Sequence, residues 1–299
     1  MRLLVLSRNT SLYSTARLIR TARALGHEVD VLDPLRLQFA ALPKTAKVLV
    51  AGRPLPHYDA VLPRIGASLT AAGAAAVAAL EDAGLPVLNG AESIVLARDK
   101  VRSLQRMAAA RVPVPRTVAL RSLGGLNEAI ELVGGCPVVV KLQNGTQGVG
   151  TMLADSTKGV TSLCETLAAL GQQVILQEFI KAARGSDIRA FVVGGRVIAA
   201  MRRTAAPGEF RSNIHRGGTG ESVKLSRRFT ATALRAAGAL GLEVAGVDIL
   251  DADGEPLVIE VNCSPGLEGI EQVTQVDIAS AVITHAAAFA TKLRRRRTR

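Results

Sequence analysis

Apolar residues gather in short runs that alternate with helix-like segments over roughly the first 95 residues. The runs typical of strands are residues 2–6, 28–33 and 60–64, and the segments typical of helices are residues 12–25 and the alanine-rich residues 67–83. Strands separated by helices predict a parallel α/β sheet in this part of the chain. No G-x-G-x-x-G follows the first strand, so the fingerprint of dinucleotide-binding folds is absent.

The pattern changes from Asp99 onward, where the strands become longer and pair as hairpins. Asp99 can cap a helix that continues to residue 110. Further strands are expected at residues 137–142, 173–179, 187–193, 196–203, 243–250 and 255–262, with helices at residues 156–170 and 226–240. Gly194 and Gly195 predict one hairpin, and the turn at residues 251–255 predicts another.

Two carboxylates and an amide interrupt the last two apolar strands. Glu260 and Asn262 are two residues apart, so their side chains share one face of their strand. The predicted hairpin brings Asp248 of the preceding strand to the same face. We expect these groups to be buried, where an unpaired carboxylate is strongly destabilising. Three hard oxygen ligands suit Mg²⁺ or Mn²⁺ bound together with phosphate oxygens, and a core arginine paired with Glu260 or Asp248 is the alternative.

A lysine and a glycine-rich segment follow the first strong apolar strand. Lys141 ends the run "PVVVK", and residues 143–150 ("QNGTQGVG") can supply backbone amides to anionic oxygens. The pattern is not G-x-x-x-x-G-K-[ST], which excludes the P-loop fold. An ammonium group here can contact a nucleotide phosphate, and a solvent-facing strand end explains the lysine equally well.

Composition limits the classes of protein to which the chain can belong. An apolar content of 48% in 299 residues excludes a disordered chain and suffices for two or three domains. No apolar stretch approaches the roughly 18 residues of a membrane span, and the first run is too short for a signal peptide. Three cysteines without metal-ligand spacing predict reduced thiols in a cytoplasmic protein.

The net charge of +12 is concentrated at the C-terminus, because residues 292–299 contain six of the basic residues. Such a run is typical of a solvated, disordered tail, and contact with nucleic acid, the ribosome or another acidic partner is the alternative. Two tyrosines and no tryptophan argue against recognition of bases by stacking, which disfavours a pure RNA-binding module.

Several motifs, taken together, resemble the ATP-grasp ligases and, within them, the RimK-type α-L-glutamate ligases. They are Lys100, "VVKLQNGTQGVG", "LQEFI", "GSDIRAFVVGGRVIAAMRR", "FRSNIHRGG", "GVDIL" and "VIEVNCSPGLEGIE". The opening "LSRNTSLYSTARL" and the segment "LPHYDAVLPRIG" resemble the same family, so the resemblance covers nearly the whole chain. The set is specific, whereas each motif alone is not.

The resemblance implies an ATP-grasp fold of mixed α/β and α+β class. The implied parts are an N-terminal parallel-sheet pre-ATP-grasp domain (residues 1–97), a first ATP-grasp lobe (98–183), a second, metal-binding lobe (184–291) and a basic disordered tail (292–299). ATP would lie between the two lobes, with two Mg²⁺ or Mn²⁺ ions per subunit.

The resemblance also implies roles for single residues. Those that would contact the ATP phosphates are Lys100, Lys141, Arg211, Ser212 and Asn213. Those that would contact the rest of the nucleotide are Glu178 and Phe179 at the adenine, through their backbone at the interlobe hinge, and Asp187 at the ribose. Those that would hold the metal ions are Asp248, Glu260 and Asn262.

The chain departs from the family pattern at two positions. Many ATP-grasp peptide ligases carry an arginine two residues before the strand aspartate, where this chain has Gly246. The charge on the transferring phosphoryl group would then be met by Arg202, Arg203 or Arg211. Cys263 stands where these ligases more often have a small residue without a thiol, and we interpret it as a packing residue.

The implied reaction joins L-glutamate to the acidic C-terminus of a ribosomal small-subunit protein through an acyl phosphate. Arg202, Arg203 and Arg216 would favour such acidic substrates. The same ATP site serves ligases that join small-molecule carboxylates and amines, so that class stays open. A homo-oligomer, for instance a tetramer, is also expected from the resemblance.

Overall fold

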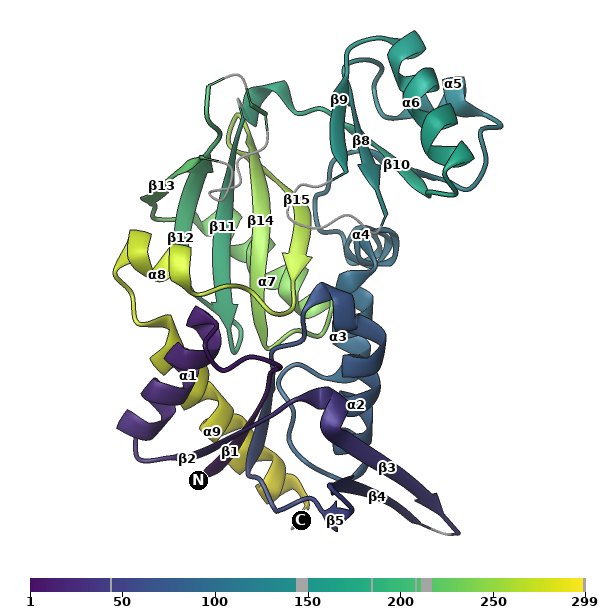
Figure 1. The fold of residues 1–299 in the computed structure, drawn as a ribbon. Helices are drawn as coiled ribbons and strands as arrows, with labels where there is room; N and C mark the ends of the chain where they lie inside the picture. The colour runs from purple at the N-terminus through teal and green to yellow at the C-terminus, as the bar shows by residue number, and fades with distance from the viewer. Residues whose placement is uncertain (44, 144–149, 184, 208, 211–216, 298–299) are drawn as a thin grey trace.

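The chain forms an N-terminal domain and two lobes, each built on its own sheet (Figure 1). The computed structural model describes all residues except 44, 144–149, 184, 208, 211–216 and 298–299. In Figure 1 the N-terminal domain lies at the bottom, the large lobe with β11 to β15 above it, and the small lobe with β8 to β10 at the upper right.

The N-terminal domain contains the parallel sheet that the sequence predicts. Its order is β2-β1-β6, formed by β1 (Arg2–Leu6), β2 (Glu28–Leu32) and β6 (Ala60–Pro63). Its helical segments are α1 (Tyr13–Ala24), α2 (Thr70–Asp82) and the 3₁₀ turns η1 (Pro34–Arg36) and η2 (Ala67–Leu69).

A second, antiparallel sheet in this domain was not predicted. It consists of β3 (Leu37–Leu42), β4 (Thr45–Val50) and β5 (Arg53–Pro54). Most of its residues are exposed on both faces, including Phe39 and Leu42. The alternation of apolar and polar residues that marks a half-buried strand is therefore missing.

The small lobe is an antiparallel sheet covered on one face by helices. Its order is β7-β10-β8-β9, formed by β7 (Thr117–Leu120), β8 (Val138–Leu142), β9 (Thr151–Ala154) and β10 (Val174–Glu178). The helices are α5 (Leu126–Leu132) and α6 (Thr157–Ala169). The buried residues of the lobe form a core of their own. The part of the chain that carries Lys141 therefore packs independently of the rest.

The large lobe is a five-stranded antiparallel sheet in the order β13-β12-β11-β14-β15. Its strands are β11 (Ser186–Val193), β12 (Arg196–Thr204), β13 (Thr219–Ser222), β14 (Val244–Ala252) and β15 (Glu255–Asn262). Both predicted hairpins are present, since β11 pairs with β12 and β14 with β15. The helix α7 (Arg227–Ala239) packs its apolar face on one side of the sheet. On the other side, one end of the sheet packs against the two C-terminal helices, and the polar residues lie toward the other end.

Two helices connect the N-terminal domain to the small lobe. They are α3 (Ala91–Arg98) and α4 (Lys100–Ala109). The predicted cap is present, because the Asp99 carboxylate accepts hydrogen bonds of 3.0 Å from the backbone of Val101 and Arg102. Residues of α3 and α4 share one hydrophobic core with the N-terminal sheet, α7 and the large lobe. The N-terminal domain and the large lobe are therefore a single packed body, and η3 (Lys181–Ala183) lies between the lobes.

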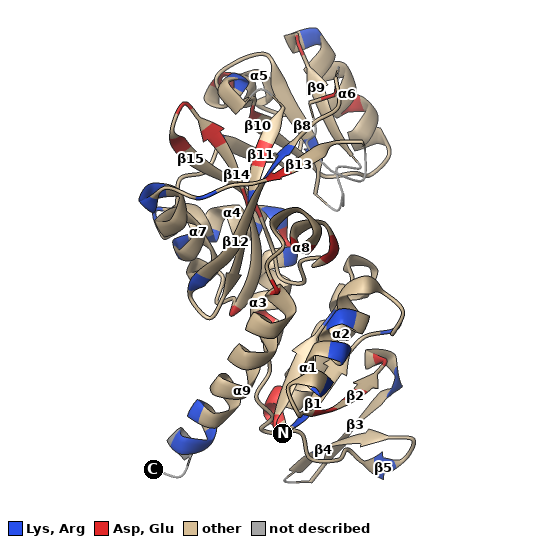
Figure 2. Cartoon of the chain, turned by 90° about the vertical axis from the view of Figure 1, so that its left-hand side faces the viewer, with Lys and Arg blue, Asp and Glu red and all other residues tan. Residues whose placement is uncertain are grey.

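The C-terminal segment differs from the expected disordered tail. After α8 (Glu268–Thr274), the helix α9 continues from Ile278 to Arg297, because lysine and arginine are good helix formers and the preceding turns are anchored by buried residues such as Ala286 and Ala290. Figure 2 shows the basic residues at its end. Among the described residues no single helix is long and apolar enough to cross a membrane, and α8 and α9 pass that test only as a pair bent by 115°.

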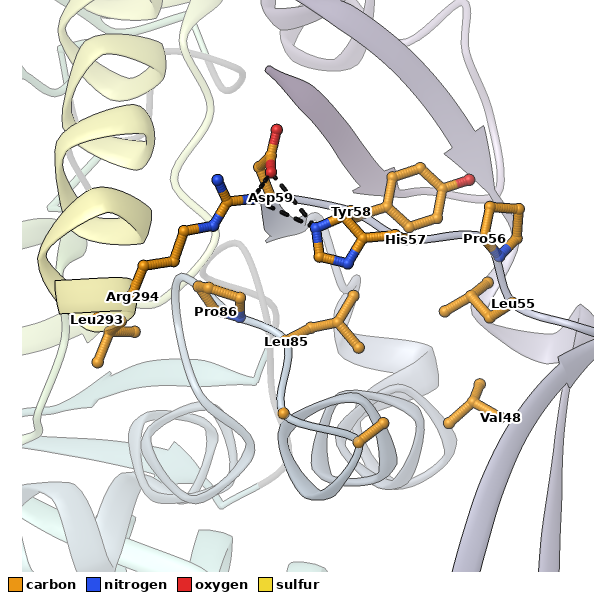
Figure 3. A pocket seen from close by; sticks show the side chains of 12 residues that line it. Val48, Leu55, Pro56, His57, Tyr58, Asp59, Leu85, Pro86, Leu293 and Arg294 are labelled. Carbon is orange, nitrogen blue, oxygen red and sulfur yellow. Dashed lines mark hydrogen bonds and ion pairs between the residues drawn. The ribbon is translucent and has the colours of Figure 1, made fainter. Parts of the chain in front are cut away.

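A cavity of about 440 Å³ lies where α9 meets the N-terminal domain (Figure 3). Its wall includes residues 55–59, residues 83–86 after α2, Leu293 and Arg294. Arg294 forms an ion pair with Asp59, whose carboxylate lies 3.5 Å from His57 Nε2. None of the described residues that line the cavity is among those to which the sequence assigns chemistry.

Candidate active site

The β14–β15 hairpin brings the three polar groups to one face, as the sequence predicts. Asp248 lies opposite Glu260 in the antiparallel register, and Asn262 lies opposite Gly246. Asp248 is 4% exposed, as expected, but the expectation that Glu260 is buried was wrong because its side chain is exposed. The reason is that Asp248 lies on an inner strand, where Arg189 and Arg203 of the neighbouring strands cover it, whereas Glu260 lies on β15 at the edge of the sheet.

Asp248 is held by two arginines from neighbouring strands. Arg189 on β11 donates to both of its carboxylate oxygens, with Nε–Oδ1 at 2.7 Å and Nη2–Oδ2 at 2.6 Å. Arg203 on β12 lies 3.1 Å from the same carboxylate. Burial alone would raise the pKa of Asp248, but the two guanidinium groups outweigh it and hold that pKa below its usual value. Asp248 is therefore paired with core arginines, as the alternative to metal binding predicts, whereas Glu260 is not.

Arg203 also pairs with the buried Asp187, the residue expected at the ribose. Arg203 Nε donates to Asp187 Oδ1 at 2.7 Å, and its Nη2 donates to the other oxygen. Burial raises the pKa of Asp187, although the charge of Arg203 opposes this. Asp187, Arg203, Asp248 and Arg189 thus form a charge ladder across β12, β11 and β14 with two positive and two negative groups.

Asn262 links this charge ladder to Glu260. With the amide oriented so that both of its ends are satisfied, the nitrogen donates to Glu260 Oε1 at 3.3 Å and the oxygen accepts from Arg189 Nη2 at 3.3 Å. Among the described residues, no three His, Cys, Asp or Glu side chains form a metal-binding group. A metal held here would therefore use the amide oxygen of Asn262 beside the carboxylates of Asp248 and Glu260.

Two lysines from different parts of the chain face Glu260. Lys141 on β8 donates to Gln177 Oε1 at 2.7 Å, and Lys100 at the start of α4 donates to the Gln143 carbonyl at 3.1 Å. Burial lowers the pKa of Lys141 to about 8, while the charge of Glu260 opposes the shift. Burial also lowers the pKa of Lys100, again against Glu260. Two desolvated cations therefore lie within the electrostatic influence of one carboxylate, and such a set of charges is suited to a phosphate chain and a bridging cation.

The residues expected at the adenine lie at the connection between the two lobes. Glu178 is the last residue of β10, and Phe179 follows it. The Glu178 carboxylate is bound by Arg116, with Nη2–Oε1 at 2.9 Å, and its backbone nitrogen donates to the Arg116 carbonyl at 2.9 Å. The hydrogen bond from Arg116 is the main cause that lowers the pKa of Glu178. This pairing fixes the hinge end of the small lobe.

Several other expected site residues are not brought to the hairpin or cannot be placed. Arg202 lies beside Arg203 on β12 but on the opposite face, where it is 3.5 Å from Asp251 and 3.7 Å from Glu221. The remaining expected residues, Arg211, Ser212, Asn213 and Arg216, lie outside the described residues, as does most of the first glycine-rich segment.

Arg189 is the residue of this site that the sequence analysis missed. A Cβ atom added to Gly246 would lie 3.7 Å from Arg189 Nε, so the Arg189 side chain fills the space beside the position where an arginine was expected. The signal in the sequence was the alternation of Asp187 and Arg189 within an otherwise apolar strand. Two charges on one face of a buried strand require partners on the neighbouring strands.

Cys263, at the end of the hairpin, is 4% exposed. Burial raises the pKa of its thiol, although the nearby positive charge of Arg98 opposes the shift. The thiol is therefore protonated near neutral pH, which supports its interpretation as a packing residue rather than a nucleophile.

Two family models match this architecture. Residues 1–94 match the RimK PreATP-grasp domain, and residues 97–286 match the RimK-like ATP-grasp domain. The chain belongs to the RimK-type ATP-grasp family. The resemblance and the fold class inferred from the sequence are thereby confirmed, and the chain is an ATP-dependent carboxylate–amine ligase.

Curated relatives are similar over nearly their full length. "Probable alpha-L-glutamate ligase 1" of Pseudoalteromonas atlantica is 48% identical over 283 residues, which cover 95% of this chain and 94% of the relative. "Probable alpha-L-glutamate ligase" of Vibrio vulnificus is 48% identical over 282 residues, which cover 94% of each chain.

Solved structures share the fold at lower identity. The ATP-grasp ligase PsnB complexed with its minimal precursor has a TM-score of 0.76 at 24% identity, covering 96% of this chain and 98% of that one. The D-alanine–D-alanine ligase of Bacillus anthracis complexed with ATP has a TM-score of 0.67 at 18% identity, covering 99% of both chains. At this identity the likeness shows the fold alone.

We predict that Glu260→Gln abolishes ligation while the fold persists. The substitution removes a negative charge that faces two lysines but leaves an exposed side chain of the same shape, so the free energy of unfolding should change by about 0.5 kcal/mol or less. Ligation and urea unfolding would be measured beside Asp253→Asn at the tip of the same hairpin, which should behave like the wild type. Undiminished turnover at saturating Mg²⁺ would contradict this role of Glu260.

We predict that nucleotide affinity falls as the pH rises above about 8, because Lys141 then loses its proton. Since bound phosphate favours the charged ammonium, log Kd for ATP should rise by up to about one unit per pH unit. Calorimetric titration between pH 7 and 9.5 checks this. Lys141→Arg should flatten the profile, because arginine stays charged. The exposed control Lys158→Arg should keep the wild-type profile, and a flat wild-type profile would show that Lys141 does not act as described.

We predict that Arg203→Met destabilises the fold by about 3–5 kcal/mol, because it leaves the buried Asp187 without a partner. The neighbouring Arg202→Met is the matched control. It removes only long, partly exposed ion pairs and should cost about 1 kcal/mol or less. Urea unfolding of both variants measures the difference in the free energy of unfolding. Equal losses would show that the charge ladder contributes no more to stability than the exposed ion pairs of Arg202.

Proposed function

We propose that this chain is an α-L-glutamate ligase that extends the acidic C-terminus of a ribosomal small-subunit protein. The observation that carries the proposal is the exposed Glu260 on the β14–β15 hairpin, opposite the buried Asp248. The charge of Glu260 acts on Lys141 of the small lobe and on Lys100 of α4. Relatives that are 48% identical and named alpha-L-glutamate ligases support the choice of amino acid.

The proposed reaction proceeds in two steps. An oxygen of the acceptor carboxylate attacks the γ-phosphorus of ATP, so that ADP leaves and an acyl phosphate forms. The amine of glutamate then attacks the acyl carbon, phosphate leaves and the amine loses a proton, which completes the peptide bond. Lys100 and Lys141 would bind the phosphate oxygens in both steps.

The metal site belongs to the same proposal. The hard oxygens of Asp248, Glu260 and Asn262 fit Mg²⁺, since two of the three groups are anionic and Glu260 is exposed toward the lysines. Mg²⁺, when bound there, would neutralise charge on the transferring phosphoryl group. Two ions per subunit and the use of Mn²⁺ are parts of the proposal. Arg189 would keep the carboxylate of Asp248 ionised and oriented.

Expectations about partners are also proposals. A net charge of +12 favours an acidic acceptor, and the basic end of α9 would add to the attraction at low salt. Three cysteines without a disulfide are consistent with the proposed cytoplasmic location. We also propose that the chain forms a homo-oligomer.

We predict that L-glutamate is the donor and that each turnover adds one glutamyl unit. A guanidinium that pairs with the side-chain carboxylate would be left without its partner by glutamine or alanine, and sites of this kind can discriminate by about a thousandfold. Aspartate, one methylene shorter, should be used better than either. Mass spectrometry of an acceptor peptide that ends in glutamates checks this, with the same peptide amidated at its C-terminus as control.

Equal use of glutamine would contradict the donor assignment. Products formed only from free amino acids would favour a small-molecule ligase. Absence of ATP turnover with any carboxylate–amine pair would contradict the whole proposal.

A further inference from the structure

Two arginines of the N-terminal domain lie near the segment that follows β15. Arg64 follows β6, and its Nη2 donates to the Pro265 carbonyl at 2.8 Å. Arg98 ends α3, and its Nη2 donates to the Ile65 carbonyl at 2.7 Å. Among the described residues neither forms an ion pair with a carboxylate, in contrast to Arg189 and Arg203 nearby.

Polar atoms at this position also lack partners. Arg98 Nε and Ser264 Oγ are buried and make no hydrogen bond within the described part of the chain. The Ser264 hydroxyl lies beside the Cys263 thiol and lowers the pKa of that thiol. Buried polar atoms in native proteins are nearly always hydrogen-bonded. Arg98 of the N-terminal domain and Ser264 after β15, the two sides of what we call the junction, each therefore offer a donor to an acceptor that the chain does not supply.

The surroundings carry uncompensated positive charge. Burial, together with the charge of Arg98, lowers the pKa of Arg64 to about 10, and the Cys263 thiol opposes this shift. Arg98 also acts on Lys100, which in turn faces Glu260. Both arginines are half-buried rather than enclosed. The junction is therefore an electropositive position that continues into the proposed phosphate site.

The junction is also held in place. Asn89 of the N-terminal domain donates to the Cys263 carbonyl at 2.9 Å and the Val244 carbonyl at 2.7 Å, and it accepts from the Val244 nitrogen at 3.0 Å. Ser264 is the second residue after Asn262, so an anion bound at Ser264 would lie next to the metal-binding hairpin.

We propose that Arg64, Arg98 and Ser264 form a subsite for a substrate carboxylate that does not react. The inference rests on the proposed ligase function and adds the place where the substrate is recognised. A planar carboxylate would accept hydrogen bonds from the guanidinium groups and from the serine hydroxyl, the donors that the chain leaves without acidic partners. The carboxylate belongs either to the incoming glutamate or to the terminal glutamate of the acceptor peptide.

Steady-state kinetics of Arg64→Met, Arg98→Met and Ser264→Ala test the subsite. The arginine variants should raise KM for one carboxylate substrate by about 10- to 100-fold, the loss expected for one charge-assisted hydrogen-bonded pair. KM for ATP should stay within about twofold. Ser264→Ala removes a single hydroxyl and should give a smaller increase in the same KM, and it covers the case in which an arginine variant does not fold. Arg102→Met, exposed on α4, is the matched control.

Substrate analogues separate recognition from a structural role. The wild type should prefer a carboxylate substrate over the matching amide. The variant that removes the recognising group should lose most of this preference. The pair glutamate and glutamine tests the donor, and the free and amidated acceptor peptides test the acceptor. A variant that lowers kcat equally for carboxylate and amide, or raises KM for ATP alone, would overturn the subsite.

The outcome is distinguishable from failure of the proposed function. If the wild type adds no glutamate, the glutamate assignment fails, and the same comparison is made with the carboxylate–amine pair that the enzyme does use. If the wild type adds glutamate and all three variants keep its KM values, the subsite alone is refuted.

Discussion

The site depends on the charge ladder of Asp187, Arg203, Asp248 and Arg189. These four side chains come from three adjacent strands, and each carboxylate receives two hydrogen bonds from one guanidinium. Any one of them buried alone would be strongly destabilising, whereas together they are neutral. The charge ladder keeps Asp248 ionised at the centre of the sheet, and through Arg189 it orients Asn262. A hairpin without this support could not present a fixed set of oxygen ligands.

The second determinant is the division of the molecule into two packed bodies. The N-terminal domain and the large lobe share one hydrophobic core, and Asn89 joins them at the end of the metal-binding hairpin. The small lobe has its own core and meets the rest through α4 and the hinge after Glu178. Lys141 therefore comes to the site from a body with its own hydrophobic core. A ligase that forms an acyl phosphate benefits from such a construction, because closure of two bodies excludes water.

The arginines of the molecule fall into two groups, those that form an ion pair with a carboxylate and those that do not. Arg189, Arg203 and Arg116 have acidic partners and serve the architecture. Within the described part of the chain, Arg64 and Arg98 donate only to backbone carbonyls. Charge alone therefore does not identify a substrate-binding arginine. The arginines expected from the sequence to attract acidic substrates include Arg203, whose guanidinium is occupied by Asp187 and Asp248.

The sequence by itself determined the parallel N-terminal sheet, both hairpins of the large lobe, the Asp99 cap and the shared face of Asp248, Glu260 and Asn262. These follow from periodicity and turn residues, which act over a few positions along the chain. The tertiary structure alone decided that Glu260 is exposed while Asp248 is buried, that Arg189 occupies the space beside Gly246, and that α9 extends through Arg297. It also decided that Arg64 donates to the Pro265 carbonyl, next to Ser264. Burial, charge pairing and desolvation depend on segments that are far apart in the chain, and no local pattern of residues encodes which of them will meet.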